Sequence, residues 1–93
     1  MWVSCQYKKE YKPAYREIVN LDKCFKIKLE ITGNVGRIFA YKENGEDHLL
    51  GEYRDYAAVK VFGEIGLLMD QKHIYLMPDE QEANEIYKET ETE

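Results

Sequence analysis

A strict alternation of apolar and charged residues over residues 25–31 is the feature that most constrains the fold. A single lysine or glutamate separates each apolar residue from the next in the series Phe25, Ile27, Leu29 and Ile31. Successive side chains of a β-strand point to opposite faces, so a period of two is typical of a strand with one buried face. We therefore expect a strand here, with its apolar residues turned toward a core.

Turn-forming residues follow this strand and divide the next part of the chain into a meander. Segment 32–36 contains two glycines and an asparagine, which tolerate positive φ, so it predicts a five-residue connection to a second strand at 37–42. The pair Asn44-Gly45 favours a type I′ turn before a third strand at 48–53. The result is three antiparallel strands.

Further short strands are indicated on both sides of this meander. Residues 2–6 and 15–21 have the β-branched and aromatic character of two upstream strands, joined irregularly around Pro13. Residues 73–77 form a short apolar run that predicts a strand rejoining the sheet, and Pro78 ends it.

The pattern changes to a helical one after residue 54. Apolar residues then recur at spacings of three and four, and Asp55 stands where a helix N-cap is expected. The apolar face consists of Ala58, Val61, Phe62, Ile65, Leu68 and Met69. The sequence therefore predicts an α+β fold in which a mostly antiparallel sheet of five to six short strands packs on one central helix, in the order βββββ-α-β.

Two glycines lie inside this predicted helix. Gly63 and Gly66 each cost about 1 kcal/mol of helix stability relative to alanine, so their presence needs a physical reason. The first explanation is that the helix backbone lies close against the sheet at these positions. The second is that a second subunit or a ligand approaches the helix closely.

The length and the charge distribution indicate one domain with an acidic tail. The chain has 93 residues and a net charge of −5, and residues 79–93 hold seven acids against one lysine. We expect a domain over 1–78 and a tail over 79–93 that forms a helical turn or two, with Ala83, Ile86 and Tyr87 on one side, before becoming disordered. Such a tail argues against general nucleic-acid binding by the whole domain.

The sequence offers little for catalysis. His48 and His73 lie outside any catalytic or metal-binding motif, and no glycine-rich phosphate loop is present, so we expect no metal and no cofactor. We interpret Cys5 and Cys24 as reduced structural thiols, and a thiol enzyme using either with a histidine is the weakest alternative. The absence of a long apolar run and of a signal-peptide pattern predicts a cytoplasmic protein that does not contact membranes.

One segment combines aromatic and basic residues in the way that nucleotide-binding surfaces do. Tyrosine rings can stack on bases while lysine and arginine contact phosphates. The candidate residues are Tyr7, Lys8, Lys9, Tyr11, Lys12, Tyr15 and Arg16. The competing interpretation is a solvated loop whose tyrosines cover the edge of the sheet.

Three blocks of sequence resemble a family of small phage and prophage proteins of Firmicutes. They are Met1-Trp2-Val3 with Gln6, then Leu50-Gly51-Glu52-Tyr53 running into Ala57-Ala58 and Val61-Phe62-Gly63-Glu64-Ile65, and finally Tyr75-Leu76-Met77-Pro78 followed by acids. The chain departs from that family at residues 7–16 and at the helix glycines. The resemblance implies no catalytic residues. It implies an accessory protein of a mobile element that binds a host protein or a signalling nucleotide.

We therefore expect a non-enzymatic binding module for a host protein. A small open sheet must pair or protect its edges, so the module is also expected to form a homo-oligomer, most simply a dimer. The alternatives are a nucleotide-signal or nucleic-acid binding protein that uses residues 7–16, and a small thiol or histidine enzyme.

Overall fold

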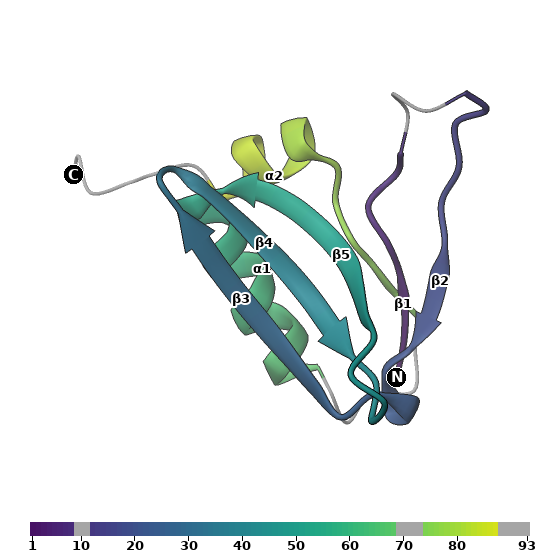
Figure 1. The fold of residues 1–93 in the computed structure, drawn as a ribbon. Helices are drawn as coiled ribbons and strands as arrows, with labels where there is room; N and C mark the ends of the chain where they lie inside the picture. The colour runs from purple at the N-terminus through teal and green to yellow at the C-terminus, as the bar shows by residue number, and fades with distance from the viewer. Residues whose placement is uncertain (9–11, 69–73, 88–93) are drawn as a thin grey trace.

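Two separate three-stranded sheets and two α-helices make up the computed structural model, which describes residues 1–8, 12–68 and 74–87 (Figure 1). The first sheet has the order β2-β1-β6 and the second the order β3-β4-β5. The strands are β1 (Trp2–Ser4), β2 (Ile18–Asn20), β3 (Lys26–Thr32), β4 (Val35–Tyr41), β5 (Asp47–Arg54) and β6 (Ile74–Leu76). The helices are η1 (Leu21–Lys23, 3-10), α1 (Asp55–Leu67) and α2 (Glu80–Ile86). The predicted α+β class is confirmed, but the prediction of one sheet is wrong.

The hairpin between β3 and β4 is tighter than the sequence predicted. Thr32 pairs directly with Val35, so Gly33 and Asn34 alone connect the strands and the predicted five-residue connection is wrong. Gly33 has a φ of 63°, and Asn34 does not have positive φ. Glycine at the first central position with positive φ is the signature of a type II′ turn, which matches the twist of the two strands.

The turn between β4 and β5 also differs from its prediction. Gly45 has a φ of 93°, but Asn44 does not have positive φ, so this is not a type I′ turn, which requires both. The Gly45 N–H donates to the Lys42 carbonyl at 3.0 Å, and the Asn44 side chain accepts from the Glu46 N–H at 2.9 Å. These contacts fit a type I turn followed by a left-handed glycine, a common three-residue hairpin connection.

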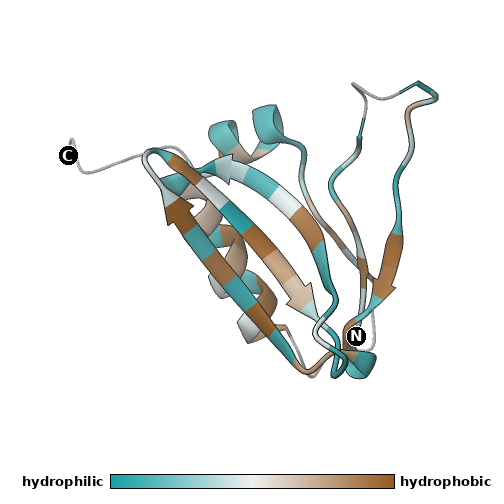
Figure 2. Cartoon of the chain, in the orientation of Figure 1, coloured by the Kyte–Doolittle hydropathy of each residue, from teal (hydrophilic) through white to brown (hydrophobic). Residues whose placement is uncertain are grey.

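Helix α1 packs against one face of the second sheet, mainly over β4 and β5 (Figure 1). Along β4, Ile38 and Ala40 are fully buried beneath the helix, and buried residues alternate with half-buried ones. β3 shows the alternation of apolar and polar residues that is expected of a half-buried strand (Figure 2). The buried face of α1 consists of Ala57, Ala58, Val61 and Ile65. Leu68 and Phe62 are half-buried against this core, and Met69 lies outside the described residues.

Two details of the predicted strand and helix need correction. The alternation predicts Phe25 and Ile31 on the core face, but Phe25 precedes β3 and is 70% exposed, and Ile31 is also exposed. The reason is that β3 is an edge strand and α1 lies chiefly over β4 and β5. Asp55 is the first helical residue and not the N-cap, because Arg54 has that position and makes no side-chain capping bond.

Helix α1 does not lie close against the sheet at either of its glycines. A Cβ atom added at Gly63 or at Gly66 would meet no described atom within 4 Å. The close approach instead occurs at Gly36 of β4, where an added Cβ would lie 2.4 Å from the Cβ of Ala58. The first explanation for the helix glycines is therefore wrong, and a second subunit or ligand stays a prediction.

The first sheet brings distant segments together around β1. β1 runs antiparallel to β2 and parallel to β6, so the strand before the meander and the strand after α1 share one sheet. The strand predicted over 15–21 is shorter, because only Ile18–Asn20 is extended and Leu21 begins the 3-10 helix. β6 confirms the predicted late strand at Ile74–Leu76, and His73 lies outside the described residues.

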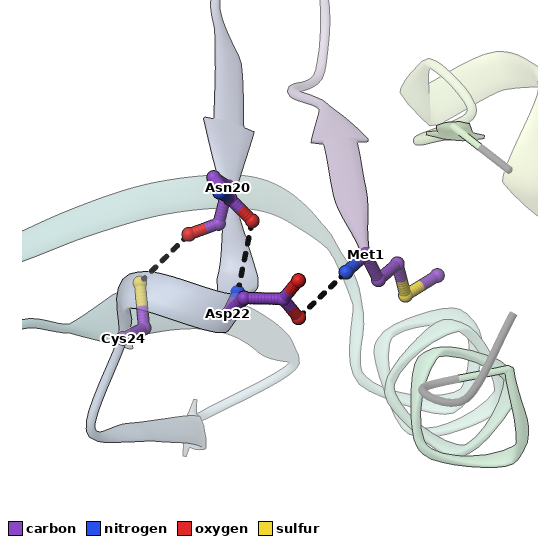
Figure 3. Close-up of polar contacts among 4 residues, drawn as sticks. All are labelled: Met1, Asn20, Asp22 and Cys24. Carbon is purple, nitrogen blue, oxygen red and sulfur yellow. Dashed lines mark hydrogen bonds and ion pairs between the residues drawn. The ribbon is translucent and has the colours of Figure 1, made fainter. Parts of the chain in front are cut away.

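Polar contacts fix the corner between β2 and β3 (Figure 3). The amino group of Met1 forms an ion pair with Asp22 at 2.7 Å, and the Asn20 side chain accepts from the Asp22 N–H at 3.0 Å. The Cys24 thiol donates weakly to the Asn20 carbonyl at 3.8 Å. The Leu21 N–H donates to the Met1 carbonyl at 2.8 Å. η1 is thereby tied to β1.

Gln6 joins the two sheets. Its N–H donates to the Leu50 carbonyl at 2.8 Å. Its side-chain amide donates to the Glu52 carbonyl at 3.1 Å and accepts from the Glu52 N–H at 2.8 Å. Gln6 thus occupies backbone groups on the outer edge of β5, where a further strand would otherwise bind.

The acidic segment forms the predicted short helix. α2 begins after a capping box in which Asp79 accepts from the Glu82 N–H at 2.7 Å and Glu82 accepts from the Asp79 N–H at 3.0 Å. Ala83 is fully buried in the same core as α1 and Tyr87 packs against that core, whereas Ile86 is exposed. Residues 88–93 lie outside the described chain. Neither α-helix within the described ranges has the length and hydropathy needed to cross a membrane.

Candidate interaction surfaces

Four of the seven predicted nucleotide-binding residues lie together on a ribbon that extends from β1 and β2. Lys8 and Tyr15 form a bridge through backbone hydrogen bonds of 2.8 and 3.4 Å, and the Lys8 Nζ lies 6.0 Å from the Tyr15 ring centre. The Arg16 Cζ lies 5.8 Å from the Tyr7 ring centre. Lys12 is exposed at the far end of the ribbon. The other two candidates, Lys9 and Tyr11, lie outside the described residues.

The two aromatic–cation pairs belong to different faces of this ribbon. Neighbouring residues of an extended strand point to opposite sides, so Tyr7 and Arg16 share one face, and Lys8 and Tyr15 share the other. One flat ligand therefore contacts one pair at a time. In addition, a cation already lies over one face of each ring, and a base could stack there only by displacing it.

The outer face of the first sheet exposes large apolar side chains. Directly paired residues share a face of a sheet, and the register places Trp2 beside Ile74, and Ile18 and Leu76 on either side of Ser4. Leu76 is 64% exposed and Trp2 is 46% exposed. We call this surface the Trp2 patch, and its members are Trp2, Ile18, Ile74 and Leu76. Sequence reasoning missed it because the pairing of β1 with β6 leaves no local signal.

The free edge of β3 is a second exposed surface. Ile27, Leu29 and Ile31 point toward the α1 side of the sheet, because they pair with the buried β4 residues Ala40, Ile38 and Gly36. Lys28 and Glu30 point to the opposite side and form an ion pair at 3.1 Å. No described strand pairs with the outer edge of β3.

An apolar pocket of about 220 Å³ lies between the beginning of β3 and the second half of α1. Phe25 and Ile27 form its sheet side, and Phe62, Ile65 and Gly66 form its helix side. The remaining lining residues are Leu21, Cys24 and Lys26. The exposed Phe25 and Gly66 of α1 thus line the same pocket, which can accept a small apolar group.

The Cys5 thiol and His48 lie near the same carboxylate, that of Glu17. Cys5 is fully buried, and burial together with the nearby Glu17 carboxylate raises the pKa of its thiol to about 11, so the thiol stays protonated at neutral pH. The His48 Nε2 lies 3.0 Å from Glu17 Oε1. Among the described residues, no group of three or more His, Cys, Asp or Glu side chains could hold a metal ion.

A polar cluster joins α1, β6 and α2. The Tyr75 hydroxyl donates to Glu64 Oε1 at 2.8 Å, and the Tyr87 hydroxyl donates to the same oxygen. Burial, followed by the hydrogen bond to Glu64, raises the pKa of Tyr87 to about 12 and raises that of Tyr75 further. The sequence carries no sign of this cluster, because its members are far apart in the chain.

Comparison of the chain with protein-family models, with curated proteins and with solved structures finds no match. The resemblance to Firmicute phage and prophage proteins therefore stays a prediction. What the chain does must be inferred from its own surfaces.

Proposed function

We propose that this chain is a non-enzymatic binding module that holds a host protein against the Trp2 patch. The observation that carries the proposal is the exposure of four large apolar side chains on one face of a three-stranded sheet. Clustered apolar groups of this kind on a small protein are typical of interaction sites.

The position of the patch suits a binding surface. β1 is the central strand of its sheet, so β2 and β6 hold the backbone of Trp2 on both sides. Tryptophan is enriched among residues that dominate binding energy, because it buries a large area with little loss of conformational freedom. The expected partner presents an apolar surface with polar groups at its edge, since the polar Asn20 lies beside Trp2 at the rim of the patch.

A paired comparison of variants tests this function. The double substitution Ile18→Thr and Leu76→Thr keeps strand-favouring side chains but removes apolar area from the patch. Ile86→Thr removes a similarly exposed side chain from α2 and serves as the control. We expect the parent and the control to retain the same partner from a Firmicute host lysate, with at least about tenfold less bound by the double variant. Equal retention by all three proteins would contradict the proposal.

The alternative function is binding of a nucleotide signal or of nucleic acid by residues 7–16. The observation that favours it is the gathering of two tyrosines and two basic residues, Tyr7, Lys8, Tyr15 and Arg16, on one ribbon. Calorimetry with mono-, di- and cyclic nucleotides tests it, with the double substitution Lys8→Ala and Arg16→Ala as the matched variant. Binding heat that the variant loses would support the alternative, and the absence of heat with the parent would exclude it for these ligands.

A further inference from the structure

We propose that two copies of this chain pair edge to edge along β3 and form a symmetric dimer with one continuous sheet. The two β3 strands run antiparallel about a two-fold axis that passes at Leu29. This interface is separate from the Trp2 patch, which belongs to the other sheet, so it does not depend on the proposed function.

β3 is the longest sheet edge without a pairing strand among the described residues. The opposite edge of its sheet, on β5, is partly occupied by Gln6. The edge strands of the first sheet have only three residues each, whereas β3 has seven. Short edges resist further pairing, but a long edge presents a row of unpaired N–H and C=O groups that a second strand can bind.

The backbone geometry of β3 selects the residues that pair. Thr32 and Val35 flank a two-residue turn and therefore form a hydrogen-bonded pair. Because such pairs alternate along an antiparallel ladder, Ile27, Leu29 and Ile31 direct their N–H and C=O groups away from β4. A two-fold axis at Leu29 places Leu29 opposite itself and Ile27 opposite Ile31 of the second copy, so all of these groups are satisfied.

The charges on β3 select the same register. With the axis at Leu29, Lys28 lies opposite Glu30 of the second copy, and this favourable pair occurs twice. A shift of the register by two residues in one direction places Lys28 opposite its own copy, and a shift in the other direction does the same for Glu30. Both shifts are repulsive, so the charges specify one alignment.

The apolar face completes the interface. Ile31 is 49% exposed and shares the α1 side of the sheet with Ile27, which lines the apolar pocket. In the proposed register, Ile31 of the second copy lies beside Ile27, at the mouth of that pocket. The pocket of about 220 Å³ has room for this side chain, and its occupation removes apolar surface from water on both molecules.

Helix α1 contributes a surface on the same side as the β3 edge. Val59, Phe62 and Gly66 are three or four residues apart, so they follow one another along the helix, and Phe62 and Gly66 line the pocket. Val59 is exposed. The two-fold axis brings the second α1 alongside in the opposite direction, and the absence of a side chain at Gly66 gives the helices room to approach.

Charge reversal tests the dimer with an internal control. Lys28→Glu places like charges opposite each other twice, and Glu30→Lys does the same, so each is expected to raise the dimer Kd at least about tenfold. The double variant with both substitutions restores opposite charges, and its Kd should return to within about threefold of the parent value. Sedimentation equilibrium measures Kd, and thermal unfolding at a low protein concentration monitors the fold.

A control variant and a salt series test whether the charges on β3 themselves determine the dimer Kd. Lys42→Glu breaks a comparable ion pair with Glu46 in the β4–β5 turn, 3.5 Å apart, and should leave Kd unchanged. Added salt should weaken the parent dimer and strengthen the dimer of either single variant, because it screens attraction and repulsion alike. A parent protein that stays monomeric up to high micromolar concentration would overturn the proposal. A dimer that all β3 variants leave unchanged, or that the double variant does not restore, would also overturn it.

Discussion

At the scale of single residues, Gly36 sets the distance between α1 and the second sheet. An alanine Cβ at this position would lie 2.4 Å from the Cβ of Ala58, far inside normal contact distance. Both atoms belong to short, rigid parts of the structure, so neither side chain can rotate away. The overlap between the two Cβ atoms can be relieved only if the whole helix moves away from the sheet.

We predict that Gly36→Ala lowers the free energy of unfolding by about 1–3 kcal/mol, because the overpacked helix must shift from the sheet. Gly63→Ala is the matched control. It adds the same atom where no described atom lies within 4 Å, and it should raise stability by about 0.5–1 kcal/mol through helix propensity. Urea unfolding measures both, and a result in which the two substitutions have the same sign would contradict this account.

The glycines also show what a sequence can reveal about single positions. Gly63 and Gly66 stand out in the sequence because they interrupt a helical pattern, whereas Gly36 lies in a segment whose sequence predicts a turn. Its actual role depends on which residue of α1 crosses β4, and that crossing is a long-range contact. The local pattern of residues around Gly36 carries no information about where α1 crosses β4.

At the scale of elements, α2 connects the acidic segment to the core. Its capping box satisfies N–H groups at the start of the helix, and Ala83 is fully buried. A helix of seven residues is too short to be stable alone, so its order depends on this cap and on packing.

We predict that Asp79→Ala lowers the global stability by about 1 kcal/mol, because it removes the cap of a helix that packs on the core. Glu85→Ala, an exposed change within the same helix, should alter stability by less than about 0.5 kcal/mol. Chemical unfolding followed by both tyrosine fluorescence and circular dichroism distinguishes the outcomes. Local fraying of α2 with an unchanged global transition would show that α2 is not part of the cooperative unit.

The strong periodic elements were predictable from sequence, but their surroundings were not. The alternation around Leu29 gave β3, and the apolar spacing around Val61 gave α1. Alternation identifies the inner face of a strand, yet it does not distinguish an edge strand from a central one. That is why Phe25 and Ile31 were expected in the core and are exposed.

At the scale of the whole molecule, the division into two sheets escaped prediction. β1, β2 and β6 have three residues each, too few for a period to be visible, and their pairing joins segments from both sides of the meander. The Trp2 patch exists only through that pairing. The ribbon near Tyr7 was recognised by composition, but composition does not show that its two aromatic–cation pairs use different faces.

Three tyrosine hydroxyl groups form hydrogen bonds between different elements of the fold. Besides the two hydroxyls on Glu64, the buried Tyr53 of β5 donates to the Pro78 carbonyl at 2.7 Å. Burial raises the pKa of Tyr53, as it does for Tyr75 and Tyr87. All three hydroxyl groups are therefore held in the protonated form by the fold.

We predict a loss of stability in alkali that begins near pH 10 and continues beyond pH 12. The folded-state pKa values lie above the unfolded value of 10.0, so the stabilisation is complete below that pH and is lost as the unfolded tyrosines ionise first. Tyr75→Phe should make the decline with pH shallower, although it lowers stability at neutral pH. Unfolding at a series of pH values tests this, with the exposed Tyr7→Phe as the control. Equal slopes in all three proteins would contradict it.

The parallel pairing of β1 with β6 has a consequence for biosynthesis. β3, β4, β5 and α1 are contiguous in the chain, so they can assemble as soon as residue 67 has emerged from the ribosome. β1 emerges earlier than all of them but must wait for Ile74–Leu76 before both of its sides are covered. During that interval the nascent polypeptide carries an unfinished sheet, and Trp2 is within reach of chaperones.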